Sequence, residues 1–232
     1  ARHQAKYVGV FTDLQAPRIR IASYETGSVS LAAGESCRLG LTVGGEKGNS
    51  SAVGIGYRDI AKSGEVDDVL LLDEGKMHLR VDSVTDSDID CTVLIGGTLS
   101  SRKGVNKLGG GIAAPALTEK DKADIRAMES IKPDYVAVSF VAAVQDIEEA
   151  RGLLKEASVD AAIIAKSERA EVVADRDLLD SIIDACEGVM VARGDLGIEV
   201  GDAELIGIQK DLISRTRKRD RMVITATQMM ES

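Results

Sequence analysis

Three charged side chains with a spacing suited to metal-assisted chemistry lie in the second half of the chain. Lys166 and Glu168 are two residues apart in the segment 161–168, and Asp195 follows the apolar run Val189–Val191. Residues two apart in a strand point the same way, so a strand over 161–168 would place Lys166 and Glu168 on one face. Carboxylates without His or Cys suit a hard cation, Mg²⁺ or Mn²⁺. Oxygens of water and of the substrate would complete the octahedral coordination of that cation. The set predicts a divalent-metal site beside an ammonium group.

A buried ion pair without any ligand is the competing interpretation. A lysine on the inner face of a sheet needs a counter-charge or an anionic ligand, and Asp195 or Glu168 alone could neutralise Lys166. The nucleotide-binding patterns GxxxxGK[ST] and GxGxxG are both missing from the sequence, so any nucleotide binding must use another device. These residues by themselves leave both interpretations open.

Alternating strands and helices must position these side chains. From Thr118, the expected N-cap of the first helix, segments with a helical period alternate with apolar segments. Helices are expected over 118–130, 144–157, 173–187 and 202–219, and strands over 134–140, 161–168, 188–195 and 222–228. This order predicts a parallel sheet covered by helices, either doubly wound or a (β/α)₈ barrel. Polar residues that end these strands are expected to share one edge of the sheet.

The sequence pattern changes over residues 21–104. Short segments with β-branched residues alternate there with Gly, Asp and Ser clusters, and a helical period is rare. This pattern predicts a compact all-β module, a small barrel inserted after a first strand over Lys6–Asp13. The expected domains are therefore 1–20 and 105–232, which form one domain together, and the inserted module 21–104.

Composition restricts the class of function. A formal net charge of -9 argues against nucleic acid or an acidic membrane as the main partner. No two of the three cysteines are spaced as CxxC, which indicates buried, reduced thiols in a cytoplasmic protein. The two histidines leave little room for a zinc site or a Ser/His/Asp triad. We see no signal peptide and no apolar run long enough to cross a membrane.

Several motifs resemble the pyruvate kinase family. They run in family order through DLQAPRIR, LLLDEGKMHL, GGTLSSRKGVN, AVSF, IIAKSERAE, VMVARGDLGIEV, GIQK and VITATQMMES. The resemblance implies an α/β fold, a (β/α)₈ TIM barrel with an inserted β-barrel lid. It also implies phosphoryl transfer from phosphoenolpyruvate to ADP, giving pyruvate and ATP, with Mg²⁺ (or Mn²⁺) and K⁺. A cytoplasmic homotetramer is expected for the full-length protein.

The resemblance also implies roles for residues at the strand ends. Lys166 matches the lysine that neutralises charge on the transferring phosphoryl group. Glu168 and Asp195 match the Mg²⁺ ligands, and the backbone amides of Gly194 and Asp195 match those that hold the substrate carboxylate. Thr227 matches the hydroxyl beside the enolate carbon, on the route by which that carbon is protonated.

Monovalent-cation and nucleotide contacts follow from the same resemblance. Asp13 matches a K⁺ ligand, while Leu14 stands where threonine is frequent and could offer only its backbone carbonyl. Arg20 and Lys103 match contacts to the nucleotide phosphates. Glu74 matches the acid of the lid near the mouth of the active site.

Departures from the family pattern carry their own expectations. Ala16 replaces the usual glycine, which is expected to shift the loop bearing Arg20, and Glu74 replaces an aspartate. Ser167 replaces an apolar residue and is expected to face away from the site. No Arg-x-Asn-x-Ser segment precedes these motifs, and about five barrel strands are too few to close a barrel, so we expect a central fragment of a longer chain. A non-catalytic remnant and a Mg²⁺-dependent C–C lyase barrel are the alternative functions.

Overall fold

The structure is a computed structural model that describes residues 8–16, 19–40, 47–57, 64–112 and 114–227. The chain divides into two compact units. Unit 1 comprises residues 1–17, 115–197 and 201–232, and unit 2 comprises residues 18–114 and 198–200. An early segment and the second half of the chain therefore build one unit, and the stretch between them builds the other.

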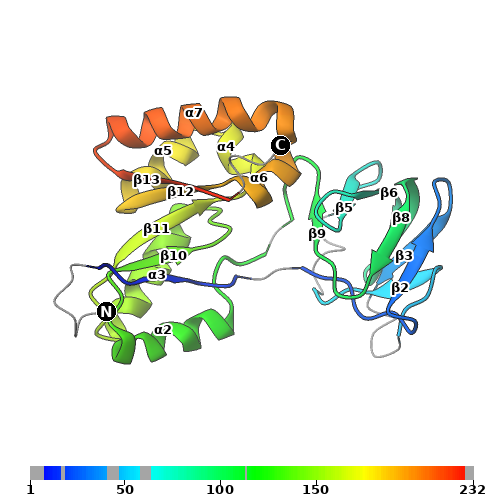
Figure 1. The fold of residues 1–232 in the computed structure, drawn as a ribbon, viewed down its shortest axis with the longest axis horizontal. Helices are drawn as coiled ribbons and strands as arrows, with labels where there is room; N and C mark the ends of the chain where they lie inside the picture. Colours follow the sequence, from blue (N-terminus) through cyan, green and yellow to red (C-terminus); the bar gives the residue numbers. More distant parts are fainter. Residues whose placement is uncertain (1–7, 17–18, 41–46, 58–63, 113, 228–232) are drawn as a thin grey trace. The chain divides into compact units, whose positions relative to one another are not determined.

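A five-stranded parallel sheet forms the centre of unit 1 (Figure 1). Its order is β1 (Phe11–Asp13), β10 (Tyr135–Val138), β11 (Ala162–Ser167), β12 (Gly188–Ala192) and β13 (Met222–Ala226). The three middle strands are almost entirely apolar because both faces of a parallel sheet are covered. All five strands run in the same direction, so their carboxyl ends meet at one edge.

Helices connect the successive strands. They are α2 (Glu119–Ile131), α3 (Val144–Glu156), α4 (Ala170–Ala174), α5 (Arg176–Ala185), α6 (Arg193–Val200) and α7 (Asp202–Lys218). Thr118 caps α2 in a capping box with Asp121, as the sequence predicted. In Figure 1, α7 runs alongside β12 and β13, which it contacts. None of the described helices combines the length and the apolar character needed to cross a membrane.

The α/β class and the partial (β/α) barrel are confirmed, with corrections to the bounds of three elements. The helix expected over 173–187 is two helices, because the Asp175 side chain accepts hydrogen bonds from Asp177 N and Leu178 N and so starts α5 as a new helix. The strand expected over 188–195 ends at Ala192, and α6 begins at Arg193. The first expected strand, Lys6–Asp13, is shorter than predicted: β1 begins at Phe11, because Val10 N donates to the Asp134 side chain and not to a neighbouring strand. Lys6–Tyr7 and Gln228, at the ends of the first and last expected strands, lie outside the described residues.

Unit 2 is built from short strands around one apolar core. A six-stranded sheet has the order β4 (Ala52–Gly54), β3 (Ser36–Gly40), β7 (Asp88–Ile95), β6 (Met77–Val84), β5 (Val69–Leu72) and β9 (Val105–Lys107). A second sheet pairs β2 (Ser28–Leu31) with β8 (Gly97–Ser100). Leu39, Leu79 and Ile89 are among the fully buried core side chains.

Residues 19–22 connect the two ends of the six-stranded sheet. On the β9 side, Ile21 N donates to Lys103 O and Val105 N donates to Ile19 O. On the β4 side, Gly56 N donates to Arg20 O, and Ile21 bridges Ile55. This short segment therefore brings the sheet close to a barrel. The module also continues past residue 104, where the sequence-based boundary lay, because β9 pairs with β5.

The cysteines are free and buried, as expected. Cys37 and Cys91 are direct partners across β3 and β7. Burial raises the pKa of Cys37 to about 11, so this thiol stays protonated at neutral pH.

Candidate active site

Lys166 is held between carboxylates that come from two other positions at the edge of the parallel sheet. Its Nζ lies 3.1 Å from Oε1 of Glu168 and 3.2 Å from Oδ2 of Asp13. Burial acts to lower the pKa of Lys166, but the charges of Glu168 and Asp13 outweigh it and raise that pKa. The side chain is therefore a fixed positive charge at the carboxyl ends of β11 and β1.

Glu168 is the buried acid of this group. It is 1% exposed, and its Oε2 accepts a hydrogen bond from Phe140 N at 2.6 Å. Its Oε1 faces Lys166 and receives no further hydrogen bond from the described residues. Burial raises the pKa of Glu168 although Lys166 and the Phe140 amide oppose the rise, and the charge of Asp195 adds to it. The carboxylates of Glu168 and Asp195 are thus close enough to repel each other.

This donor set fits a hard divalent cation. Glu168 offers a buried oxygen with one partner, and Asp195 stands in the first turn of α6 at the end of the next strand. The described residues contain no group of three or more His, Cys, Asp or Glu side chains arranged for a metal. Mg²⁺ needs no such cage, because one or two carboxylates suffice when water and substrate oxygens fill the other positions. A divalent cation would also relieve the repulsion between the two acids.

Gly194 and Thr227 meet at the same edge. Gly194 N, in the first turn of α6, donates to Thr227 Oγ1 at 3.1 Å, and Thr227 Oγ1 donates to Ala226 O at 2.7 Å. Thr227 follows β13 with a φ of 68°, in the left-handed region. The backbone amide predicted to hold a substrate carboxylate therefore has the Thr227 hydroxyl as its acceptor here.

Asp13 and Leu14 present oxygens around one hydroxyl group. Ser139 Oγ donates to Leu14 O at 3.0 Å and also lies 3.4 Å from Asp13 Oδ1. The side chain of Leu14 is a buried hydrocarbon without oxygen, so the backbone carbonyl is the only oxygen that this residue offers. Carboxylate, carbonyl and hydroxyl oxygens are the ligand types that a hard monovalent cation accepts. The two residues predicted to bind K⁺ are thus neighbours of Lys166.

The predicted nucleotide contacts lie in unit 2. Arg20 Nη1 donates to Arg102 O at 2.8 Å, and Lys103 Nζ lies 2.7 Å from Oδ1 of Asp73. A hydrogen bond from Lys103 to Asp73 and the charge of Asp73 raise the pKa of Lys103. Glu74 is exposed in the β5–β6 turn, with a φ of 59°. Arg20, Lys103 and Glu74 therefore all belong to unit 2.

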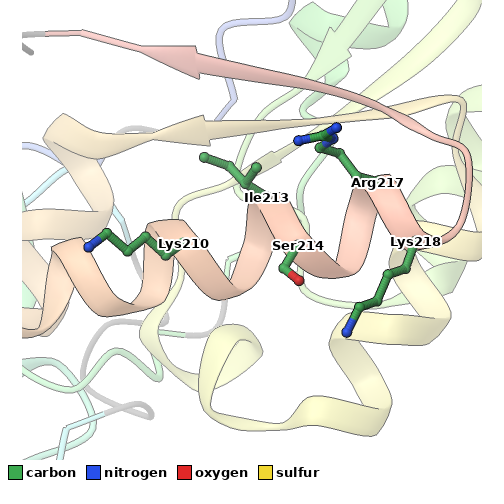
Figure 2. Close-up of a pocket in the computed structure, with 5 residues that line it drawn as sticks. All are labelled: Lys210, Ile213, Ser214, Arg217 and Lys218. Atoms are coloured by element: carbon green, nitrogen blue, oxygen red, sulfur yellow. The ribbon is translucent and has the colours of Figure 1, made fainter.

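A shallow hollow on α7 is unrelated to this chemistry. It has a volume of about 470 Å³ and is lined by Lys210, Ile213, Ser214, Arg217 and Lys218. Figure 2 shows the three basic side chains pointing in different directions along the helix, so they do not converge on one point. None of the residues predicted for the active site lines it.

Sequence reasoning gave no role to two groups that hold this site together. The Ser139 hydroxyl accepts from Lys166 Nζ at 2.9 Å, and the Phe140 amide binds Glu168. Both follow β10, and the polar end of that strand was a visible signal for Ser139. A backbone amide such as that of Phe140 leaves no signal in the residue type.

Comparisons with known proteins show the family of this chain. The family model for the pyruvate kinase barrel domain matches residues 1–232. The chain belongs to the pyruvate kinase family. It is 49% identical to pyruvate kinase II of Salmonella typhimurium over 227 residues, 98% of this chain and 47% of that protein. Over 232 residues it is 46% identical to the pyruvate kinase of Haemophilus influenzae, covering 100% of this chain and 48% of the relative.

More distant family members match over the same extent. The pyruvate kinase of Mycobacterium tuberculosis (strain H37Rv) is 39% identical over 225 residues, 97% of this chain and 47% of that protein. The chain thus spans about half the length of the curated pyruvate kinases that it matches. Membership of the family is therefore established for the barrel domain.

Proposed function

We propose that this chain carries the site at which a phosphoryl group passes from phosphoenolpyruvate to ADP, giving pyruvate and ATP. The observation that carries the proposal is the Lys166 ammonium, held by Asp13 and Glu168 at the strand ends of a pyruvate kinase family barrel. Phosphoryl transfer depends mainly on positioning and on charge stabilisation rather than on covalent chemistry by the protein. A fixed ammonium beside acids suited to a divalent cation supplies both.

Lys166 would neutralise the charge on the phosphoryl oxygens during transfer. Its raised pKa keeps it protonated through neutral pH, so no proton needs to be taken up before the substrate binds. Glu168 and Asp195 would hold Mg²⁺ or Mn²⁺. When bound, that metal supplies positive charge to the substrate oxygens and to the developing enolate.

Gly194 and Thr227 would act on the pyruvate half of the substrate. The Gly194 amide stands in the first turn of α6, where backbone N–H groups favour an anion. A substrate carboxylate at that amide would replace the Thr227 hydroxyl as its acceptor. The released hydroxyl would then lie beside the enolate and on the route by which its carbon receives a proton.

The remaining predicted contacts complete the proposal. Asp13 and the Leu14 carbonyl would bind K⁺, and Arg20 and Lys103 would bind the phosphates of ADP, with Glu74 as the acid of the lid. Cytoplasmic location, a homotetrameric full-length protein and the lack of nucleic-acid or membrane partners remain predictions.

A coupled assay tests the proposal. The product of the complete reading frame that contains this chain is given phosphoenolpyruvate, ADP, Mg²⁺ and K⁺, and pyruvate is followed with lactate dehydrogenase and NADH. We expect turnover there and little or none from the 232-residue chain alone. A complete product without turnover would contradict the proposal and favour a non-catalytic binding protein.

Lys166→Ala separates catalysis from the simple ion-pair alternative. We expect this change to lower kcat by at least about 100-fold, as for other preorganised charges, while the protein still unfolds cooperatively. Loss of folding would instead indicate that Lys166 serves to neutralise buried acids. Arg38→Ala, which removes an exposed ion pair with Asp90 in unit 2, is the matched control and should leave kcat unchanged.

A further inference from the structure

Phe140 adopts an unusual backbone conformation at the end of β10. Its φ is 52°, in the left-handed region that side chains larger than glycine disfavour. Such a conformation persists only where the surrounding structure fixes it. Phe140 N is also the donor to Glu168 Oε2, so this backbone conformation directs a hydrogen bond into the candidate active site.

Arg169 holds the other polar group of the same residue. Its Nε donates to Phe140 O at 2.7 Å, and its Nη1 lies 3.3 Å from Oε1 of Glu171. Arg169 is 6% exposed, which is rare for a guanidinium unless hydrogen bonds compensate for lost hydration. Two consecutive residues, Glu168 and Arg169, therefore bind the N–H and the C=O of one residue that follows the neighbouring strand, β10.

We propose that Arg169 is a positioning residue for the metal-binding carboxylate of Glu168. By holding the Phe140 carbonyl, it keeps the Phe140 amide directed at Oε2. That bond fixes the carboxylate, so that Oε1 stays directed toward Lys166 and the cation position. The inference rests on the proposed function because it takes Glu168 as a ligand of Mg²⁺ or Mn²⁺. Residues that orient metal ligands in this manner commonly govern metal affinity.

A purely structural role is the alternative. Arg169 is also the N-cap residue of α4 and forms an ion pair with Glu171, so it could serve only to attach this short helix. In that case its loss would lower stability and leave metal affinity unchanged. Metal binding without substrate, measured together with thermal stability, distinguishes the two roles.

The experiment uses Mn²⁺ as the probe on the substrate-free product of the complete reading frame, with free Mn²⁺ measured by electron paramagnetic resonance. Arg169→Met removes the donor to Phe140, and Arg169→Lys keeps a cation that can still donate one hydrogen bond. Arg151→Met is the matched control, because Arg151 also binds one backbone carbonyl and one carboxylate, Ala185 O and Glu187. Glu168→Gln gives the Kd for Mn²⁺ that is expected when the metal ligand itself is lost.

We expect Arg169→Met to raise the Kd for Mn²⁺ by about 10-fold, the lower end for residues that orient metal ligands. Arg169→Lys should fall between wild type and Arg169→Met, and Arg151→Met should match wild type. In the coupled assay on the complete product, the Mg²⁺ concentration for half-maximal rate should rise more than the KM for ADP.

Unchanged Mn²⁺ affinity in a folded Arg169 variant overturns the inference, even when its thermal stability is lower. If Arg169→Met does not fold, Arg169→Lys decides by the same measurement. Failure of the proposed function gives a different result, since wild type and Glu168→Gln would then bind Mn²⁺ equally weakly. If only the inference fails, those two proteins differ and the Arg169 variants match wild type.

Discussion

Ser139 accepts a hydrogen bond from Lys166, with its Oγ 2.9 Å from Nζ. Ser139 is 2% exposed, and its own O–H donates to the backbone carbonyl of Leu14 at 3.0 Å. Because the proton points at Leu14, a lone pair of the hydroxyl faces the ammonium group. Ser139 therefore fixes the direction of Lys166 and links it to the predicted K⁺ ligands.

Removing this hydroxyl should weaken catalysis more than folding. A hydrogen bond to a charged group contributes about 1.5–3 kcal/mol, so Ser139→Ala should lower kcat/KM for phosphoenolpyruvate by about 10-fold or more. The coupled assay on the complete product measures this, and urea unfolding measures stability. Ser130→Ala, which removes an exposed hydroxyl on α2, is the control. An unchanged kcat/KM in the Ser139 variant would contradict a role in holding Lys166.

Restoring glycine at residue 16 should stabilise the protein. Ala16 has a φ of 54°, so the chain keeps the left-handed conformation that suits the glycine usual in the family. The left-handed conformation costs a residue with a β-carbon about 1–2 kcal/mol, and glycine avoids this cost. Glycine also gives the unfolded chain more conformational freedom, which offsets part of the gain in stability. We expect Ala16→Gly to raise the free energy of unfolding by about 0.5–1 kcal/mol.

The control for Ala16→Gly is a second alanine-to-glycine change. Ala157, the C-cap residue of α3, has a φ of -80° and gains nothing from glycine. Ala157→Gly should leave stability unchanged or lower it. Equal effects of the two substitutions in urea unfolding would refute the explanation from backbone conformation.

Three buried hydroxyl groups have no hydrogen-bond partner among the described residues, and two of them are the aliphatic hydroxyls Ser167 Oγ and Thr216 Oγ1. A buried polar group without a hydrogen bond costs about 1–3 kcal/mol. Ser167→Ala and Thr216→Val should therefore each raise the free energy of unfolding, by about 1 kcal/mol. Thermal and urea unfolding check this, and destabilisation by both changes would show that hidden partners satisfy the two hydroxyls. Ser181→Ala, whose hydroxyl binds Asp177 O, should not stabilise.

Acid should weaken the attachment of α5 to α7. Asp180 on α5 accepts from Arg215 Nη1 at 2.9 Å and lies 2.7 Å from Arg219 Nη2, both on or next to α7. Burial acts to raise the pKa of Asp180, but the two guanidinium groups outweigh it and lower that pKa. The stabilisation is therefore complete above the unfolded pKa of about 3.9 and is lost as the pH falls through the lower folded pKa.

Urea unfolding at pH 7 and pH 3 measures this effect. The wild type should lose more stability between these values than Asp180→Asn, which has no carboxylate to protonate at this position. Asp86→Asn, at an exposed carboxylate in the β6–β7 turn, should behave as wild type. The same acid sensitivity in all three proteins would rule out the Asp180 contacts as its source.

Local patterns in the sequence were sufficient for much of unit 1. Alternation along 161–168 predicted that Lys166 and Glu168 share a face, and their charged atoms lie 3.1 Å apart. The cap at Thr118 was visible for the same reason, since a capping box spans only four residues, here 118–121. Both are contacts between residues close in sequence.

The supports of the site depend on pairings that no local pattern records. Glu168 and Arg169, near the end of β11, bind Phe140, which follows the adjacent strand β10. Phe140 also has a φ that its residue type disfavours. The end of β12 at Ala192 was missed because Arg193 and Gly194 are also compatible with a strand that ends in a turn. Only the sheet register shows which backbone groups face the carboxylates.

The bridging segment 19–22 in unit 2 has a consequence for biosynthesis. Its partners Lys103 and Val105 are synthesised more than eighty residues later, so the near-barrel cannot form before β9 has left the ribosome. Until then, the outer edge of β5 lies open to pairing with other nascent chains. An excised module that begins at Ile21 would lose the pairings of Ile19 and Arg20 permanently, whereas one that begins before Ile19 keeps them.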